Sequence, residues 1–242
     1  MARFLFIPGA WHGGSCFERL RAPLERAGHS MLTPDLPGAG GDARAMAQVS
    51  LEGWAQFIVG EARRQAEPVI LCAHSRGGII ASQAAELAPE AFAALVYISG
   101  ALIPDGQSLY DMIGRSMETG RFGAALSPVH GGLGLRFDPA AAAEFFYQLC
   151  SPEDQRQSAA QLIDEPVRPF STALRLTAAR FGRVPRHYIE CAQDRTFPLD
   201  VQRAMQAVLP CRSVTTLQSD HSPFISMPET LAGALATIAE QE

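Results

Sequence analysis

The sequence lacks several features that would assign it to a large class of proteins. It has no run of lysine or arginine, and its net charge is -5. Neither nucleic acid nor an anionic membrane is therefore expected as a partner. No apolar stretch approaches the roughly 20 residues that span a bilayer, and the N-terminal segment reaches Pro8-Gly9 before the apolar region of a signal peptide is complete. We expect a cytoplasmic protein.

Cysteine is also scarce. The chain has five cysteines, an odd number, at positions 16, 72, 150, 191 and 211. Such scattered residues argue against a disulfide framework and are typical of small core side chains in a reducing compartment.

The 242 residues, with 47% hydrophobic content, suffice for one α/β domain with an insertion. Apolar runs alternate with helical patterns, which predicts a mainly parallel, doubly wound sheet of about six strands. The predicted strands cover residues 3–7, 29–33, 69–72, 94–99, 187–191 and 213–217. The predicted helices between them cover residues 16–27, 51–65, 78–87, 199–208 and 228–240.

The alternation stops in the middle of the chain. The pattern of residues 104–184 predicts helices without strands. Two of these helices cover residues 139–150 and 152–162, and the residues before them, Asp138 and Ser151, are candidate N-caps. We expect residues 1–103 and 185–242 to form the core and this interval to form a helical cap over the carboxyl edge of the sheet.

Residues 71–78, Leu-Cys-Ala-His-Ser-Arg-Gly-Gly, place one serine between small residues, after an apolar run and before a helical pattern. This is the pattern of a nucleophile elbow, in which the residues two before and two after the serine must be small. Ala73 and Gly77 meet that requirement. The pattern predicts that Ser75 presents its hydroxyl at the top of the sheet, beside backbone N–H groups that can stabilise negative charge.

A serine hydroxyl needs a histidine to accept its proton. Of the six histidines, only His187 and His221 lie well downstream of Ser75. His187 falls inside a predicted strand, whereas His221 lies in a polar loop after the last strand. We therefore favour His221 as the general base.

The histidine in turn needs an acid to orient it, and that acid should lie between the serine and the histidine in the chain. Asp194 follows a predicted strand and is favoured. Asp220 is the alternative, but adjacent residues in an extended loop point apart, so it cannot readily reach the imidazole of His221. Asp200 lies in the following helix, a less suitable position.

An acyl-transfer site also needs two donors for the developing oxyanion. We expect one from the backbone N–H of Arg76, directly after the serine, and one from Ala10 in the glycine-rich loop of residues 8–14. The alternative for this loop is a simple tight turn. The guanidinium of Arg76 would either bind a substrate carboxylate or pair with an internal acid, and pairing is favoured.

With these parts in view, the chain resembles the α/β-hydrolase superfamily. Within it, the similarity is to the branch of plant methylesterases, hydroxynitrile lyases and bacterial pyrethroid-type carboxylesterases. The matching pieces are residues 9–14, residues 73–78, Asp194 with Pro198 and Gln202, and Asp220-His221 with Ser226 and Pro228. The resemblance implies Ser75 as nucleophile, His221 as base, Asp194 as acid, and the backbone amides of Ala10 and Arg76 as oxyanion hole.

The chain departs from that family at two positions. Members usually begin the first loop with His-Gly, and this chain has Pro8-Gly9. The lyases carry a lysine directly after the catalytic histidine, where this chain has Ser222. The missing cation favours hydrolysis over cyanohydrin cleavage. Ser75 in place of aspartate excludes dehalogenases and ordinary epoxide hydrolases.

We expect a serine hydrolase that needs no cofactor and no metal. Its substrate would be a small apolar or aromatic carboxylic ester, cleaved through an acyl-enzyme. Candidate pocket residues are Gly9, Trp11, Phe145 and Phe146. Two alternatives are a lyase or carbon-carbon bond hydrolase on the same scaffold, and a non-catalytic small-molecule receptor. No sequence pattern indicates the oligomeric state.

Overall fold

The central sheet has six strands, and every neighbouring pair is parallel. The computed structural model describes residues 1–118 and 120–242; residue 119, within the predicted cap, lies outside the described residues. The strand order is β2-β1-β3-β4-β8-β9. The strands are β1 (Arg3–Ile7), β2 (Ser30–Leu32), β3 (Val69–His74), β4 (Phe92–Ile98), β8 (Arg186–Cys191) and β9 (Ser213–Leu217). The predicted parallel sheet of six strands is confirmed.

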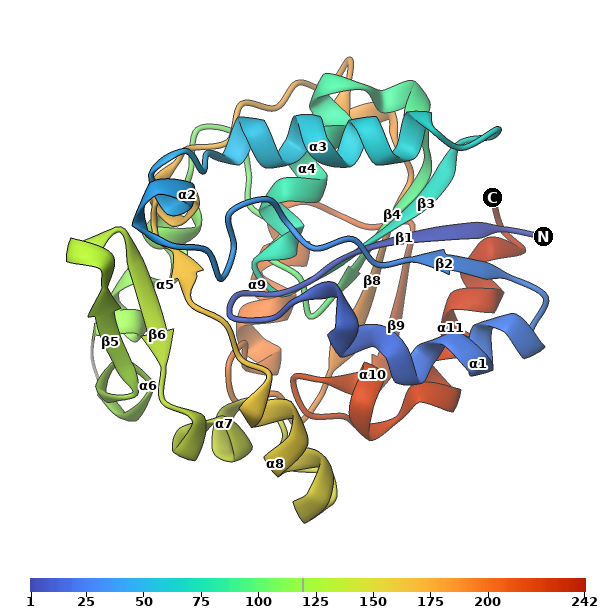
Figure 1. Ribbon diagram of the computed structural model, residues 1–242. Helices are drawn as coiled ribbons and strands as arrows, with labels where there is room; N and C mark the ends of the chain where they lie inside the picture. The colour runs from blue at the N-terminus through green and yellow to red at the C-terminus, as the bar shows by residue number, and fades with distance from the viewer. Residues whose placement is uncertain (119) are drawn as a thin grey trace.

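Helices cover both faces of this sheet, as Figure 1 shows, with α3 and α4 on one side and α1 and α11 on the other. This explains why every residue of β3 is buried and apolar up to its last position. The covering helices are α1 (Glu18–Arg26), α3 (Leu51–Arg63), α4 (Gly77–Leu87), α9 (Leu199–Val208) and α11 (Pro228–Ala239). As the sequence predicts, Pro228 opens the last helix, where its missing N–H costs no hydrogen bond.

The segment between β4 and β8 differs in part from the prediction. It contains the expected helices, but also a three-stranded antiparallel sheet in the order β5-β6-β7, so the expectation of an interval without strands was wrong. These strands are two to four residues long, too short to show a period of two in the sequence. The segment comprises α5 (Leu109–Glu118), α6 (Gly120–Ala124), β5 (Leu126–Val129), β6 (Gly134–Phe137), α7 (Pro139–Phe145), α8 (Pro152–Ala160) and β7 (Glu165–Pro166).

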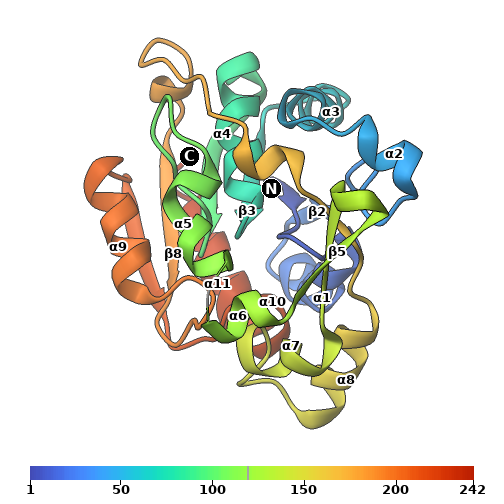
Figure 2. The ribbon, with the colours of Figure 1, turned by 90° about the vertical axis from the view of Figure 1, so that its left-hand side faces the viewer.

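The two predicted helix caps in this segment are present. The side chain of Asp138 accepts a hydrogen bond from Ala140 N, and that of Ser151 accepts one from Asp154 N. Helix α7 ends at Phe145, five residues earlier than predicted. Figures 1 and 2 show that the segment lies beyond the carboxyl ends of the central strands.

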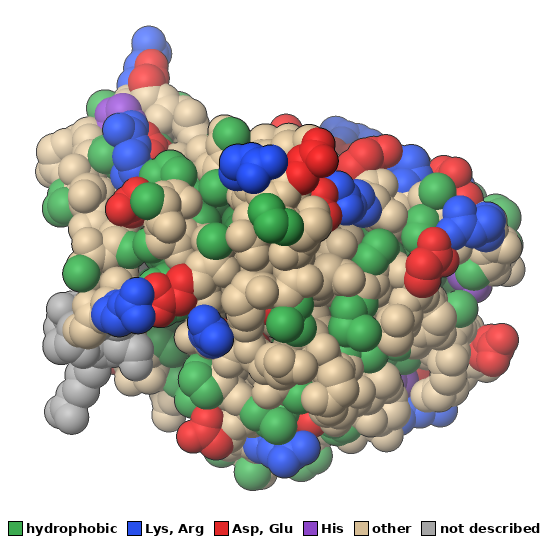
Figure 3. All heavy atoms as spheres, turned by 90° about the horizontal axis from the view of Figure 1, so that it is seen from below, with side chains coloured by type: hydrophobic (Ala, Val, Ile, Leu, Met, Phe, Trp, Pro, Cys, Tyr) green, Lys and Arg blue, Asp and Glu red, His purple; other side chains and the backbone are tan. Residues whose placement is uncertain are grey.

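Two short helices, α2 (Ala43–Ala47) and α10 (Pro223–Ser226), were not predicted from the sequence. All five cysteines are free thiols. None of the helices in the described ranges combines the length and apolar character needed to cross a bilayer. On the face shown in Figure 3, acidic and basic side chains are interspersed, and neither sign dominates.

The start of α4 packs so closely that only glycine fits at its second position. A Cβ added to Gly78 would lie 2.6 Å from Ala101 N and closer still to Ala101 O. We expect Gly78→Ala to lower the free energy of unfolding by about 1–3 kcal/mol, because backbone must move to admit the methyl group. Urea denaturation measures this change.

Gly60→Ala is the matched control. Gly60 lies within α3, and no atom lies within 4 Å of its added Cβ. The same substitution should therefore raise stability there, by up to about 1 kcal/mol. Equal effects at both positions would contradict the close approach at Gly78.

Candidate active site

Ser75 lies in the sharp turn between β3, which ends at His74, and α4, which begins at Gly77. Its φ is +51°, a left-handed conformation that is uncommon for a residue with a side chain and typical of a nucleophile elbow. A Cβ on Gly77 would lie 2.9 Å from Ile7 O, so the residue two after the serine must be small. The predicted elbow geometry is present.

The loop after β1 lies directly against this elbow. A Cβ on Gly9 would lie 2.7 Å from His74 Nδ1 and 3.0 Å from Ser75 Cβ. Glycine at this position therefore allows the backbone of the loop to approach the serine. A larger residue would displace the loop from the serine.

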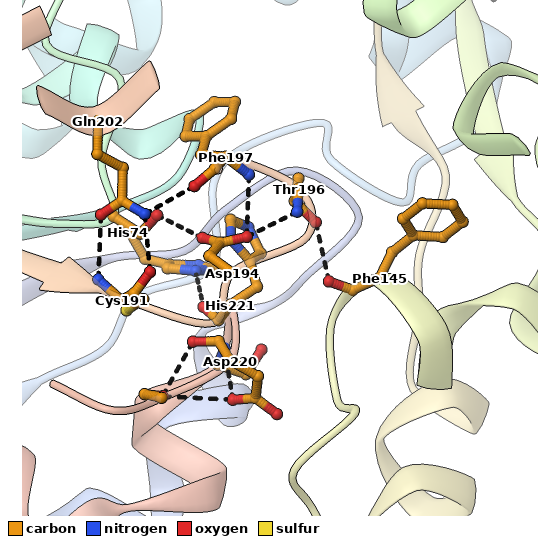
Figure 4. A network of polar contacts seen from close by, with 12 residues as sticks. His74, Phe145, Cys191, Asp194, Thr196, Phe197, Gln202, Asp220 and His221 are labelled. Atoms are coloured by element: carbon orange, nitrogen blue, oxygen red, sulfur yellow. Dashed lines mark hydrogen bonds and ion pairs between the residues drawn. The ribbon is translucent and has the colours of Figure 1, made fainter. Parts of the chain in front are cut away.

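His221 and Asp194 form a buried hydrogen-bonded pair. The distance between His221 Nδ1 and Asp194 Oδ2 is 2.6 Å, and the two side chains are 2% and 0% exposed. Because an ionised carboxylate only accepts hydrogen bonds, Nδ1 carries the proton and Nε2 is left as the basic nitrogen. The structure thus brings together the histidine and the acid that the sequence favours (Figure 4).

Asp194 is held by three further hydrogen bonds. Ser99 Oγ donates to Oδ2 over 2.5 Å, while the backbone N–H groups of Thr196 and Phe197 donate to Oδ1 over 2.7 and 2.9 Å. Gln202 in turn donates to the carbonyl of Phe197 over 2.6 Å. With all four bonds made, the carboxylate has a fixed orientation toward the imidazole.

The alternative residues have other partners. Asp220 accepts hydrogen bonds from Leu149 N over 3.0 Å and from Ser226 Oγ over 2.7 Å, and its carboxylate makes no hydrogen bond to an imidazole among the described residues. It therefore joins the His221 loop to the segment between β4 and β8. His187 lies in β8 and pairs with Ser213 Oγ over 2.7 Å, as expected for a structural residue.

A second imidazole connects His221 to the elbow. His74 Nε2 donates to the His221 carbonyl over 2.7 Å, and the two rings are 4.5 Å apart. Burial lowers the pKa of His74 well below its ordinary value, so this ring stays neutral. Ser75 is 6% exposed and His221 is 2% exposed, so both residues are buried.

Two backbone donors at this site have no protein acceptor. Within the described ranges, neither Ala10 N nor Arg76 N donates a hydrogen bond, although both residues are buried. Buried N–H groups without a partner are rare in folded proteins. These are the two amides that the sequence predicts as oxyanion donors.

His12, in the loop after β1, makes two buried contacts through its ring nitrogens. Nδ1 lies 2.7 Å from Ala10 O and Nε2 lies 2.6 Å from Tyr147 Oη. Since the carbonyl only accepts, Nδ1 donates and Nε2 accepts from the tyrosine hydroxyl. Burial lowers the pKa of His12 to about 4, so it is neutral at physiological pH.

Aromatic side chains pack over the histidine. Phe146 lies 5.8 Å from the His221 ring and stacks on Trp11 at 6.0 Å. Trp11 is 3% exposed and its indole N–H donates to Leu135 O over 3.0 Å, which places it beneath the segment between β4 and β8. Phe145 packs on Phe122 at 5.1 Å.

The guanidinium of Arg76 pairs with Glu165, with Nε and Oε1 2.9 Å apart. The expected pairing with an internal acid is confirmed. Ser99, Tyr147 and Glu165 were not predicted from the sequence as site residues. Ser99 could have been found, because it directly follows a central strand, whereas the other two lie in the segment whose strands were not predicted.

In the described part of the chain, no group of three or more His, Cys, Asp or Glu side chains could hold a metal ion.

Comparison with known proteins agrees with this architecture. A family model described as "Alpha/beta hydrolase family" matches residues 4–234, and the chain belongs to this family. Methylesterase 7 of Arabidopsis thaliana is 31% identical, over 99% of this chain and 96% of that protein. The pyrethroid hydrolase of Sphingobium wenxiniae is 30% identical, over 98% and 87%.

Solved structures of this branch have the same fold. A crystal structure of a pyrethroid hydrolase gives a TM-score of 0.84 at 28% identity, covering 99% of this chain and 97% of the other. A methylesterase from Arabidopsis gives 0.85 at 24% identity, with complete coverage of both chains (100% each), which is a likeness of fold. The resemblance seen in the sequence is confirmed.

The neutral state of His12 makes stability depend on pH. Below about pH 6.5 the unfolded chain takes up a proton at His12, whereas the native protein does so only near its pKa of about 4. The neutral His12 therefore leaves the free energy of unfolding unchanged above pH 6.5, and that free energy falls by about 3 kcal/mol as the pH falls from 6.5 to 4. In His12→Gln, chemical denaturation between pH 4 and 7 should show a shallower decline than in the wild type. An equal slope in the two proteins would contradict a neutral, buried His12.

Proposed function

We propose that the chain is a serine esterase that needs no cofactor and cleaves a small, apolar or aromatic carboxylic ester. The observation that carries this proposal is the His221–Asp194 pair, which leaves Nε2 as the basic nitrogen of a fixed imidazole, and His221 contacts the elbow of Ser75 through His74. The two unpaired amides of Ala10 and Arg76 supply the matching anion site. The names of the relatives, methylesterase and pyrethroid hydrolase, support ester cleavage.

The reaction follows from these parts. Ser75 Oγ attacks the ester carbonyl as its proton passes to His221 Nε2, and the oxyanion accepts hydrogen bonds from Ala10 N and Arg76 N. Collapse breaks the bond to the alcohol oxygen, which takes the proton from Nε2. A water molecule then gives a proton to Nε2 and attacks the acyl-enzyme. The bond between the acyl group and Ser75 Oγ breaks, Oγ takes the proton back from Nε2, and the acid is released.

Residues 104–184 would act as the cap. The Phe146 ring lies 5.8 Å from the His221 ring, and the backbone carbonyl of Phe145 accepts a hydrogen bond from Thr196 Oγ1, two residues after Asp194, over 2.9 Å. Apolar walls of this kind suit an apolar or aromatic ester. Gly9 and Trp11, on the loop after β1, are the other candidate pocket residues, and the Trp11 indole stacks on Phe146.

Ser75→Ala tests the nucleophile. We expect kcat for a short-chain aryl ester to fall by about 10⁶-fold, to the background rate, because no acyl-enzyme can form. Labelling by a fluorophosphonate, followed by mass spectrometry, should also disappear. Persistent labelling of the variant, or turnover at the wild-type rate, would assign the reaction to another residue.

Substrate panels separate the alternatives. Turnover of cyanohydrins or β-diketones in preference to esters would indicate a lyase or carbon-carbon bond hydrolase. Binding of small molecules, measured as a rise in melting temperature, without turnover of any ester would indicate a receptor.

A pair of equivalent substitutions tests the acid. Asp194→Asn removes the charge that fixes the His221 tautomer, and kcat should fall by about 10⁴-fold. Asp220→Asn changes a carboxylate that contacts Leu149 and Ser226 instead, so kcat should fall far less. Steady-state kinetics of both variants distinguish the two carboxylates. A larger loss in Asp220→Asn would reverse their roles.

A further inference from the structure

We propose that the side chain of Arg76 is the positioning group of the oxyanion site. Its guanidinium holds the peptide between Gly9 and Ala10 so that the Ala10 N–H points at the substrate oxygen. The backbone N–H of the same residue is the second donor. The inference rests on the proposed esterase function and adds how the anion site of that esterase is built.

The guanidinium reaches the loop after β1 directly. Arg76 Nη2 donates to Gly9 O over 3.0 Å and to Glu165 Oε2 over 3.3 Å, while Nε lies 2.9 Å from Glu165 Oε1. The side chains of Arg76 and Glu165 are 1% and 0% exposed. The two charges are therefore paired and buried, where a hydrogen bond to an ion is strong. The hydrogen bonds come from Nη2, whereas Arg76 Nε, Arg76 Nη1 and Glu165 Oε1 have no partner of hydrogen-bond geometry among the described residues.

The contact with Gly9 O fixes the direction of the Ala10 N–H. The carbonyl of Gly9 and the N–H of Ala10 belong to one peptide unit, which is planar and trans, so the two groups point in opposite directions. A donor that holds the oxygen on one side therefore aims the N–H to the other. A cation on the oxygen also polarises the peptide and makes the N–H a stronger donor.

Glu165 fixes the peptide unit on the other side of Ala10. Its Oε2 accepts the backbone N–H of Trp11 over 3.1 Å, and Trp11 has a φ of +62°. A tryptophan in the left-handed region is a strained conformation that its surroundings must impose. The two peptide units that flank Ala10 are thus both clamped, one by Arg76 and one by Glu165.

Stability alone does not account for a buried pair of this kind. Removing two charges from water is costly, and burial lowers the pKa of Arg76 and raises that of Glu165. Apolar side chains of similar volume often give an equally stable or more stable protein. The pair is explained by what it orients, and it fixes the loop that has Pro8-Gly9 in place of the family's His-Gly.

Arg76→Met tests the clamp. The oxyanion forms only after attack, so loss of its donor should act on the transition state and not on substrate binding. We expect kcat for an aryl ester to fall by about 10–100-fold and KM to stay within about twofold. The inhibition constant of an aryl trifluoromethyl ketone, which forms an oxyanion with the serine, should rise by the same factor.

Arg136→Met is the matched control. Arg136 pairs with Asp164, the neighbour of Glu165 in the chain, over 2.8 Å, but its side chain is 61% exposed. Its kcat and inhibition constant should match the wild type.

The double variant Arg76→Met/Glu165→Leu separates positioning from folding. It removes both buried charges, so its melting temperature should recover relative to Arg76→Met and to Glu165→Leu, each of which leaves one charge unpaired. We expect kcat to stay low in this stable variant. Recovery of wild-type kcat together with stability would overturn the proposal and leave a purely structural ion pair.

The rate of phosphonylation of Ser75 by a fluorophosphonate distinguishes this inference from the proposed function. The phosphoryl oxygen uses the same donors. If the wild type reacts with the reagent but hydrolyses no ester, the esterase proposal fails. The role of Arg76 is then tested by comparing the phosphonylation rates of its variants with that of the wild type. A rate at least about tenfold lower in Arg76→Met and in the double variant supports the clamp, and equal rates overturn it. If Ser75 of the wild type reacts with neither, both proposals fail.

Discussion

The left-handed backbone at Ser75 is the constraint on which the rest of this structure depends. A φ of +51° at a residue with a side chain is unfavourable, and the turn persists because β3 and α4 fix both of its ends. The close approaches at Gly77 and Gly78 admit no side chain, so the helix can begin directly against the sheet. The serine hydroxyl and the N–H of Arg76 are then placed at the same edge by one turn of backbone.

Burial strengthens the hydrogen bonds and charge interactions around this turn. Asp194 accepts four hydrogen bonds with no exposure of its side chain, and the imidazoles of His12 and His74 remain neutral because the site excludes water. In such a site the dipoles and charges act with little screening. The same burial makes each missing partner costly, and the buried side-chain atoms without a hydrogen-bond partner among the described residues include His74 Nδ1, Arg76 Nε and Nη1, Glu165 Oε1 and Ser222 Oγ.

The segment between β4 and β8 contributes to the site and does more than cover it. Glu165 from β7 binds both Arg76 and the backbone of Trp11, and the hydroxyl of Tyr147 binds the imidazole that holds Ala10 O. The loop after β1 therefore depends on contacts from both parts of the chain. Its geometry is coupled to the position of the segment, since a displacement of β7 would remove the acceptor of two hydrogen bonds.

The sequence by itself determined the six-stranded parallel sheet, the elbow at Ser75 and the choice of Asp194 and His221, because apolar runs, small residues at fixed offsets and chain order are local properties. It did not predict β5, β6 and β7, whose strands are too short for periodicity to show. Only the tertiary structure decided that Glu165 meets Arg76, 89 positions earlier in the chain, and that Asp220 accepts a hydrogen bond from Leu149 N. Such pairings depend on how distant segments pack, and neither the spacing nor the type of these residues encodes that contact.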